Sequence, residues 1–154
     1  MKVNLNYEHA CQNIDGVPKT ADVQTWIKAA LQGSDRDSVS LSVRVVDEQE
    51  IADLNLRYRH KSGPTNVLSF PFEDPPGVET DELGDVIVCA PVVSREAGEQ
   101  DKDPQAHWAH MIVHGVLHLR GYDHQNDDDA VEMESEETRI LTRLGFPEPY
   151  SPTN

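Results

Sequence analysis

The segment from Pro104 to Arg120 limits the possible folds of this chain more than any other stretch of the sequence. Asp103 and Pro104 predict the start of a helix, because aspartate is a favoured N-cap and proline fits the first helical turn. The apolar residues that follow occur almost all round the helix: Trp108, Met111, Ile112, Val113, Val116, Leu117 and Leu119. A helix without a polar face must be surrounded by other elements. We therefore expect a central, buried helix.

The sequence on either side of this helix predicts a small sheet and further helices. We expect four strands, at about 3–7, 39–45, 66–72 and 85–90, from alternating, β-branched or continuous apolar residues. We expect helices at about 20–33, 47–60, 91–99 and 128–144 from apolar periodicity and boundary residues. The interpretation is a single α+β domain over residues 1–154, with a small mixed four-stranded β-sheet, five to six helices and a disordered tail after about residue 149.

Particular residues also predict where these elements begin, end and pack. Thr20 is a candidate N-cap for the first helix, and Asp47 resembles the first residue of a capping box for the second. The apolar face of that second helix consists of Ile51, Leu54 and Tyr58. Pro71 predicts that the third strand lies at the edge of the sheet or ends there, because proline lacks the backbone N–H.

The composition excludes several classes of protein. A length of 154 residues fits one ordinary domain. The chain has neither an apolar signal segment at its start nor a run of about 18 apolar residues, so we expect a cytoplasmic protein without a membrane partner. Cys11 and Cys89 lie far apart in the sequence, which provides neither a disulfide framework nor a zinc ribbon.

The formal net charge of −15 argues against binding nucleic acid through its phosphates, which needs a basic surface. Much of the negative charge is concentrated in residues 127–137, DDDAVEMESEE. We expect this acidic run to form a solvated face or the start of a helix. The net charge therefore weakens an RNA-binding hypothesis without excluding a local basic cleft.

The central helix carries histidines at a spacing that suits a metal ion. Residues four apart on a helix are rotated by about 40° and displaced by roughly 6 Å, so His114 and His118 project toward a common point. Gly121 can end the helix in a left-handed conformation, which lets the chain turn back and present His124. Three protein ligands with one open position are typical of a catalytic zinc site, so we expect one zinc ion or another transition metal.

Other histidines on the same helix allow a rival ligand set. His110 precedes His114 by four residues, so His110, His114 and His118 form an alternative triad. Ligands on three consecutive turns of a straight helix would span roughly 12 Å, too far for bonds of about 2 Å to one ion. We therefore prefer His124 as the third ligand and expect His107 and His110 to pack or to support the ligands.

The histidine spacing equals that of the metzincin protease motif, H-E-x-x-H-x-x-G-x-x-H. The glutamate that acts as general base in that motif would stand at position 115, where this chain has Gly115. A metzincin-like zinc metallopeptidase is therefore an alternative function.

A second group of candidate site residues is basic: Arg57, Arg59 and Lys61 lie within five positions. Their spacing alone does not distinguish a functional site from ordinary surface charge.

Three motifs together resemble one protein family. HGVLHLRGYDH, preceded by NLRYRHKSGPTNVLSFPFE and LGDVIVC, is similar to the YbeY family of metal-dependent endoribonucleases, over about Asn55 to His124. The resemblance implies single-strand-specific cleavage in ribosomal RNA maturation, including the 3′ end of 16S rRNA, and ribosome quality control. It implies single-stranded RNA and the ribosome, or ribosomal and assembly proteins, as partners, and no DNA. It also implies that His114, His118 and His124 bind the metal and that Arg59 is needed for activity.

These residues suggest a mechanism for RNA cleavage. A metal ion held by His114 and the other two histidines would lower the pKa of a water molecule or polarise a phosphoryl oxygen. Arg59 would neutralise charge on the phosphate, and Lys61 would contact the substrate. Asp85, at the mouth of a strand, and Asp123, beside the third ligand, are candidates for orienting a ligand or water, with a structural role as the alternative. A non-catalytic, ribosome-associated metal-binding module is a third possible function, although it has no use for an open coordination position.

Overall fold

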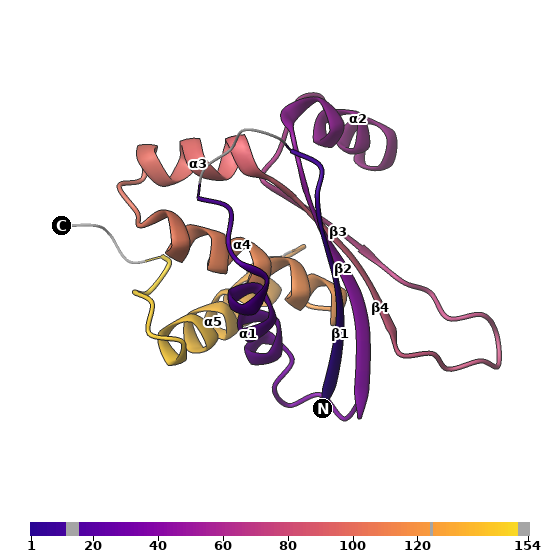
Figure 1. Cartoon of the computed structure of the whole chain (residues 1–154). Helices are drawn as coiled ribbons and strands as arrows, with labels where there is room; N and C mark the ends of the chain where they lie inside the picture. The colour runs from indigo at the N-terminus through magenta and orange to yellow at the C-terminus, as the bar shows by residue number, and fades with distance from the viewer. Residues whose placement is uncertain (12–15, 124, 151–154) are drawn as a thin grey trace.

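A computed structural model of the chain describes residues 1–11, 16–123 and 125–150. These residues form one α+β domain with four strands and five helices in the predicted order (Figure 1). The first half contains β1 (Lys2–His9), α1 (Thr20–Ala30), β2 (Ser38–Val46) and α2 (Glu48–Arg59). The second half contains β3 (Val67–Pro71), β4 (Glu82–Cys89), α3 (Ala90–Glu99), α4 (Pro104–Leu119) and α5 (Asp127–Arg143).

The sheet is mixed, with the strand order β1-β2-β4-β3. β1, β2 and β4 run parallel, and β3 pairs antiparallel with β4. The predicted edge position of β3 is confirmed, and Pro71 is its last residue. β4 lies between two strands and under helices on both faces, which explains its nearly continuous apolar sequence.

Helices cover the two faces of the sheet unequally. α1, α3, α4 and α5 lie on one side and α2 lies alone on the other (Figure 1). Side chains of β4 alternate between these layers: Val86 and Val88 belong to the large core that contains α4, whereas Ile87 and Cys89 pack in a smaller core with Ile51 of α2. The register of β4 therefore fixes which of its residues reach α4.

The central position predicted for the 104–120 helix is confirmed. α4 contacts α1, α3, α5, β3 and β4, and most of its residues are buried. It is the most apolar helix of the domain, yet no helix within the described ranges is long and apolar enough to cross a membrane. The histidines of α4 are thus held in a helix that packing fixes on several sides.

Two of the three predicted N-caps are confirmed. The side chains of Asp103 and Asp47 accept hydrogen bonds from backbone N–H groups of the first turns of α4 and α2, at 3.0 and 2.9 Å. The prediction for Thr20 is wrong, because Thr20 is itself the first residue of α1. Lys19 occupies the cap in an extended conformation, and its side chain makes no capping hydrogen bond.

The structure describes the chain as far as Tyr150, at the start of the tail that we expected to be disordered. The carbonyl oxygen of Pro149 accepts a hydrogen bond from Nζ of Lys102 at 2.9 Å, and Tyr150 contacts α4 and α5. Residues 151–154 lie outside the described residues. The C-terminal segment is therefore attached beside α4 at least as far as Tyr150.

Candidate functional site

A cleft of about 720 Å³ lies where the end of α2, strand β3 and the end of α4 come together. Its walls include His114 and His118 from α4, Arg59 and Lys61 from the end of α2 and the loop after it, and Asp123. The histidine motif and the basic motif are more than 50 positions apart in the sequence, and the fold brings them into one cavity. Both halves of the site expected from the sequence therefore face the same space.

The two histidines of α4 are directed toward each other. Their Nε2 atoms lie 3.1 Å apart, and the His114 side chain is one-fifth exposed. Two nitrogens bound at about 2.0–2.1 Å by one tetrahedral zinc ion are ~3.3 Å apart, so this separation suits ligands that share an ion. α4 ends just beyond His118, and Gly121 has the left-handed φ of 97° expected for it.

His124, the third predicted ligand, lies outside the described residues. Within residues 1–11, 16–123 and 125–150, no group of three or more His, Cys, Asp or Glu side chains is arranged to hold a metal ion. The described part of the site therefore provides two of the three predicted nitrogen donors.

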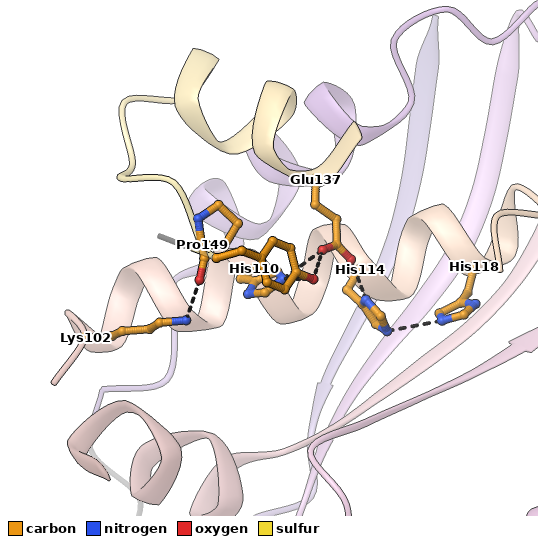
Figure 2. Close-up of polar contacts among 7 residues, drawn as sticks. Lys102, His110, His114, His118, Glu137 and Pro149 are labelled. Atoms are coloured by element: carbon orange, nitrogen blue, oxygen red, sulfur yellow. Dashed lines mark hydrogen bonds and ion pairs between the residues drawn. The ribbon is translucent and has the colours of Figure 1, made fainter. Parts of the chain in front are cut away.

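A buried carboxylate on α5 binds the other ring nitrogen of His114. Glu137 points from α5 toward α4, where the three histidines His110, His114 and His118 follow one another along the helix (Figure 2). Its Oε1 atom lies 2.5 Å from Nδ1 of His114, and its Oε2 atom lies 3.0 Å from Nε2 of His110. Glu137 itself has no exposed surface.

Hydrogen bonding keeps this buried carboxylate ionised. Burial alone acts to raise the pKa of Glu137, but the hydrogen bonds from His110 and His114 outweigh it and lower the pKa to about 2. An ionised carboxylate only accepts hydrogen bonds, so Nδ1 of His114 and Nε2 of His110 must be the protonated nitrogens that donate to it. The lone pair of a neutral His114 is then on Nε2, the atom that faces His118.

Tyr150 completes the set of groups around Glu137. Its hydroxyl donates a short hydrogen bond to Oε2 of Glu137 and lies 3.2 Å from Nε2 of His110. Burial and the neighbouring Glu137 raise the pKa of Tyr150, so the hydroxyl keeps the proton that it donates.

A second pair of a histidine ring and a carboxylate lies nearer the start of α4, where Nε2 of His107 is 2.9 Å from Oε1 of Glu96.

Comparison with known proteins assigns this chain to a family. A family model described as endoribonuclease YbeY matches residues 6–145, nearly the whole chain. The chain belongs to the YbeY family. The fold is also similar to the solution structure of TM1509 from Thermotoga maritima, with a TM-score of 0.57 and 26% sequence identity over 96% of this chain and 99% of that one.

Membership in the YbeY family implies a hydrolase, an endoribonuclease that takes part in ribosomal RNA processing. RNA is therefore the implied substrate, and the family is generally metal-dependent. The donor set fits such a metal: two imidazole nitrogens face each other, and one of the rings donates its second N–H to a carboxylate, as ligating histidines usually do.

Gly115 separates this YbeY site from the metzincin-like alternative. A Cβ atom on Gly115 would lie 2.6 Å from Cγ1 of Val86, and the Gly115 carbonyl accepts a hydrogen bond from Oγ of Ser69 at 2.9 Å. α4 therefore lies directly against the sheet at this position. The glutamate that a metzincin protease would carry here has no space, because β3 and β4 occupy it.

The two aspartates proposed to orient a ligand are placed differently. Asp123 lines the cleft. Asp85 is exposed on β4 and alternates with Val86, so it points to the face of the sheet opposite α4. We therefore correct the expectation for Asp85, because the pleat of β4 directs its side chain away from the histidines.

The sequence interpretation missed Glu137, and a signal for it was present. We expected residues 127–137 to be solvated, which does not hold for Glu137. It shares the buried stripe of α5 with Met133, Ile140 and Leu141. A charged residue at an apolar position indicates a buried partner. Tyr150 carried no such signal, because no regular element surrounds it.

Tyr58 belongs to the apolar face predicted for α2, but it is not buried like Ile51. It is 57% exposed and lines the cleft. Its ring meets the ring of Phe70 edge to face, with centroids 5.3 Å apart. The end of α2 thus presents an aromatic ring and a guanidinium group to the same cavity as the histidines.

Proposed function

We propose that this YbeY-family chain is a metal-dependent endoribonuclease specific for single-stranded RNA. It acts in the cytoplasm on ribosomal RNA, including the 3′ end of 16S rRNA, and in ribosome quality control. Its partners are the ribosome or ribosomal and assembly proteins. The observation that carries the proposal is the meeting of His114, His118, Arg59 and Lys61 in one cleft.

The proposed metal centre consists of His114, His118 and His124 with one zinc ion, or another transition metal, per chain. Imidazole nitrogens suit such metals, and the 3.1 Å separation of the two described Nε2 atoms supports a shared ion. A bound metal supplies Lewis acidity, which activates water or polarises a phosphoryl oxygen. His114 presents Nε2 to the cleft because its Nδ1–H is held by Glu137.

Arg59 and Lys61 bind the phosphates of the RNA in this proposal. Both side chains are exposed and line the cleft, so each can reach a phosphate without moving the helix. The guanidinium of Arg59 offers a planar pair of donors that matches two phosphate oxygens, and it stabilises charge that develops during cleavage. In this proposal, these two cations provide a local site for phosphates on a chain whose net charge is −15.

Aromatic side chains in the cleft support a preference for single strands. Tyr58 and Phe70 both line it, and Tyr58 is more than half exposed. Unpaired bases can stack on such rings, whereas the bases of a duplex are already stacked on each other. A strand whose phosphates lie near Arg59 would have its bases beside Tyr58.

The proposal is tested by measuring metal content and RNA cleavage on one preparation, with and without chelator. We expect cleavage of a single-stranded RNA that contains the 16S 3′-end sequence, and much slower cleavage of its duplex, of the DNA analogue and of casein. His114→Ala should lose the metal and the cleavage together, while the exposed His9→Ala keeps both. Casein cleavage would favour the metallopeptidase, and a metal-loaded protein that cleaves neither polymer would favour the binding module.

Arg59 has a matched control two positions away. Arg57 is exposed on the same helix but does not line the cleft. We expect Arg59→Ala to lower kcat by about 100-fold, as for other removed oxyanion donors, and Arg57→Ala to lower it less than two-fold. Equal effects of the two substitutions would refute the role of Arg59 and leave only general electrostatic attraction.

A further inference from the structure

Glu137 is a charged residue in a buried position, so other interactions must offset the free-energy cost of burying its carboxylate. It has no exposed surface and lies on a stripe of α5 that is otherwise apolar. A buried charge is strongly unfavourable unless it is paired and hydrogen-bonded. Three groups provide that compensation: the rings of His110 and His114 and the hydroxyl of Tyr150.

The arrangement of these three groups is asymmetric with respect to the cleft. His114 faces it, whereas His110 is buried one turn earlier on α4, away from it. Glu137 therefore uses one oxygen for the ring that reaches the cleft and the other for two groups that do not reach it. His110 and Tyr150 contact one oxygen of the carboxylate. The other oxygen contacts His114, and Figure 2 shows Glu137 between His110 and His114.

We propose that Glu137 is a positioning residue for His114. By accepting the Nδ1–H of His114, it holds the ring in the tautomer and orientation that present Nε2 to His118 and the cleft. His110 and Tyr150 support this role by holding the second carboxylate oxygen. The inference rests on the proposed function, in which His114 is a metal ligand, and it assigns a role to residues outside the histidine motif.

A purely structural role for Glu137, as a polar link between α4 and α5, makes a different prediction. A structural link changes the stability of the protein but leaves the tautomer of His114 and the affinity for zinc unchanged once the protein is folded. A positioning role changes both. Partners of ligating histidines typically contribute 10–100-fold to metal affinity.

The first measurement needs no variant. In the metal-free wild type, long-range ¹H–¹⁵N NMR spectra of the imidazoles report which nitrogen of His114 carries the proton. We expect Nδ1–H for His114, and His114→Gln identifies its signals. A wild-type His114 that is protonated on Nε2 alone would overturn the proposal, whatever the variants do.

The second measurement compares zinc affinities by competition with a chromophoric chelator. Glu137→Met keeps the approximate volume and removes both acceptors; we expect zinc to bind about 10–100-fold more weakly and His114 to gain Nε2–H. Glu137→Gln keeps one acceptor oxygen and should recover most of the affinity. Glu136→Gln is the matched control, because Glu136 is adjacent on α5 and pairs with Arg139 instead of a histidine.

The possible failures are distinguishable. If wild type and His114→Ala bind zinc equally, the proposed metal centre is refuted, and the role of Glu137 with it. If the wild type binds zinc through His114 but Glu137→Met binds it within two-fold of the wild type, only the positioning role is refuted. Thermal unfolding of each variant separates a loss of fold from a loss of affinity.

Discussion

The close approach of α4 to the sheet at Gly115 makes a quantitative prediction. In Gly115→Ala, the new Cβ atom would lie 2.6 Å from Cγ1 and 3.2 Å from Cγ2 of Val86, and 3.3 Å from Oγ of Ser69. Ordinary carbon–carbon contacts are about 3.5–4.0 Å. Val86 is fully buried in a central strand and β-branched, so it has little freedom to move aside.

Two opposing effects set the magnitude. Overpacking a core typically costs about 1–3 kcal/mol, and a contact this short belongs to the upper part of that range, about 2–3 kcal/mol. Alanine is favoured over glycine inside a helix by about 1 kcal/mol. The net destabilisation expected for Gly115→Ala is therefore about 1–2 kcal/mol. In a protein of this size, that lowers Tm by about 2–8 °C.

Urea and thermal unfolding of four variants test this reasoning. Gly98 provides the matched control, because it is an exposed glycine of α3 where a Cβ atom would have no neighbouring atom of the described residues within 4 Å. Gly98→Ala should stabilise the protein by up to about 1 kcal/mol. Val86→Ala removes the clashing methyl groups, so the double variant with Gly115→Ala should be more stable than the sum of the single effects by about 2 kcal/mol.

Two results would contradict the argument. One is a Gly115→Ala protein as stable as Gly98→Ala, which would mean that α4 can move away from the sheet at no cost. The other is additivity of Gly115→Ala and Val86→Ala within about 0.5 kcal/mol, which would mean that the two side chains do not interact.

Three further predictions concern the cleft and the histidines. Tyr58→Leu should weaken binding of single-stranded RNA by about 5–150-fold, corresponding to ~1–3 kcal/mol for a stacked base, while Tyr58→Phe keeps the affinity; equal titration curves for the wild type and Tyr58→Leu would exclude stacking. Zinc at about 100 times its Kd should raise Tm by about 5–10 °C, through ~2.7 kcal/mol of linkage, and His118→Ala or a chelator should remove this shift. Burial lowers the pKa of His107 below its ordinary 6.5 despite the hydrogen bond to Glu96. As the pH falls, His107 therefore binds a proton more readily in the unfolded chain than in the folded protein. The free energy of unfolding should decrease as the pH drops below about 6.5. In urea unfolding between pH 7 and pH 5, His107→Gln should reduce this loss, and an unchanged pH dependence would show that other groups cause it.

The secondary structure and the position of α4 could be predicted because local patterns determine them. Apolar periodicity and capping residues such as Asp103 act within a few positions, and an apolar helix can only be central. The face of the sheet toward which each side chain points was harder to predict. Asp85 belongs to a continuous apolar run, and only the pairing of β4 with its neighbours decides which residues face α4.

The two motifs of the candidate site were visible in the sequence, but their relation was not. His114 and His118 are related by helix geometry, whereas their proximity to Arg59 depends on how α2 and α4 pack around β3. The link between His114 and Glu137 depends on the docking of α5 in the same way. Contacts between distant segments leave only indirect traces in a sequence, such as a glutamate on an apolar stripe.

The dependence of His114 on a residue of a later helix has a consequence for the newly made protein. During synthesis the histidines of α4 leave the ribosome before Glu137 and Tyr150 do, because both residues follow α4 in the chain. Until α5 docks, the imidazole of His114 lacks its hydrogen bond to Glu137. If Glu137 has the proposed role, a nascent chain whose α5 has not yet docked would lack the group that orients His114, and the proposed site would be complete only after α5 has packed against α4.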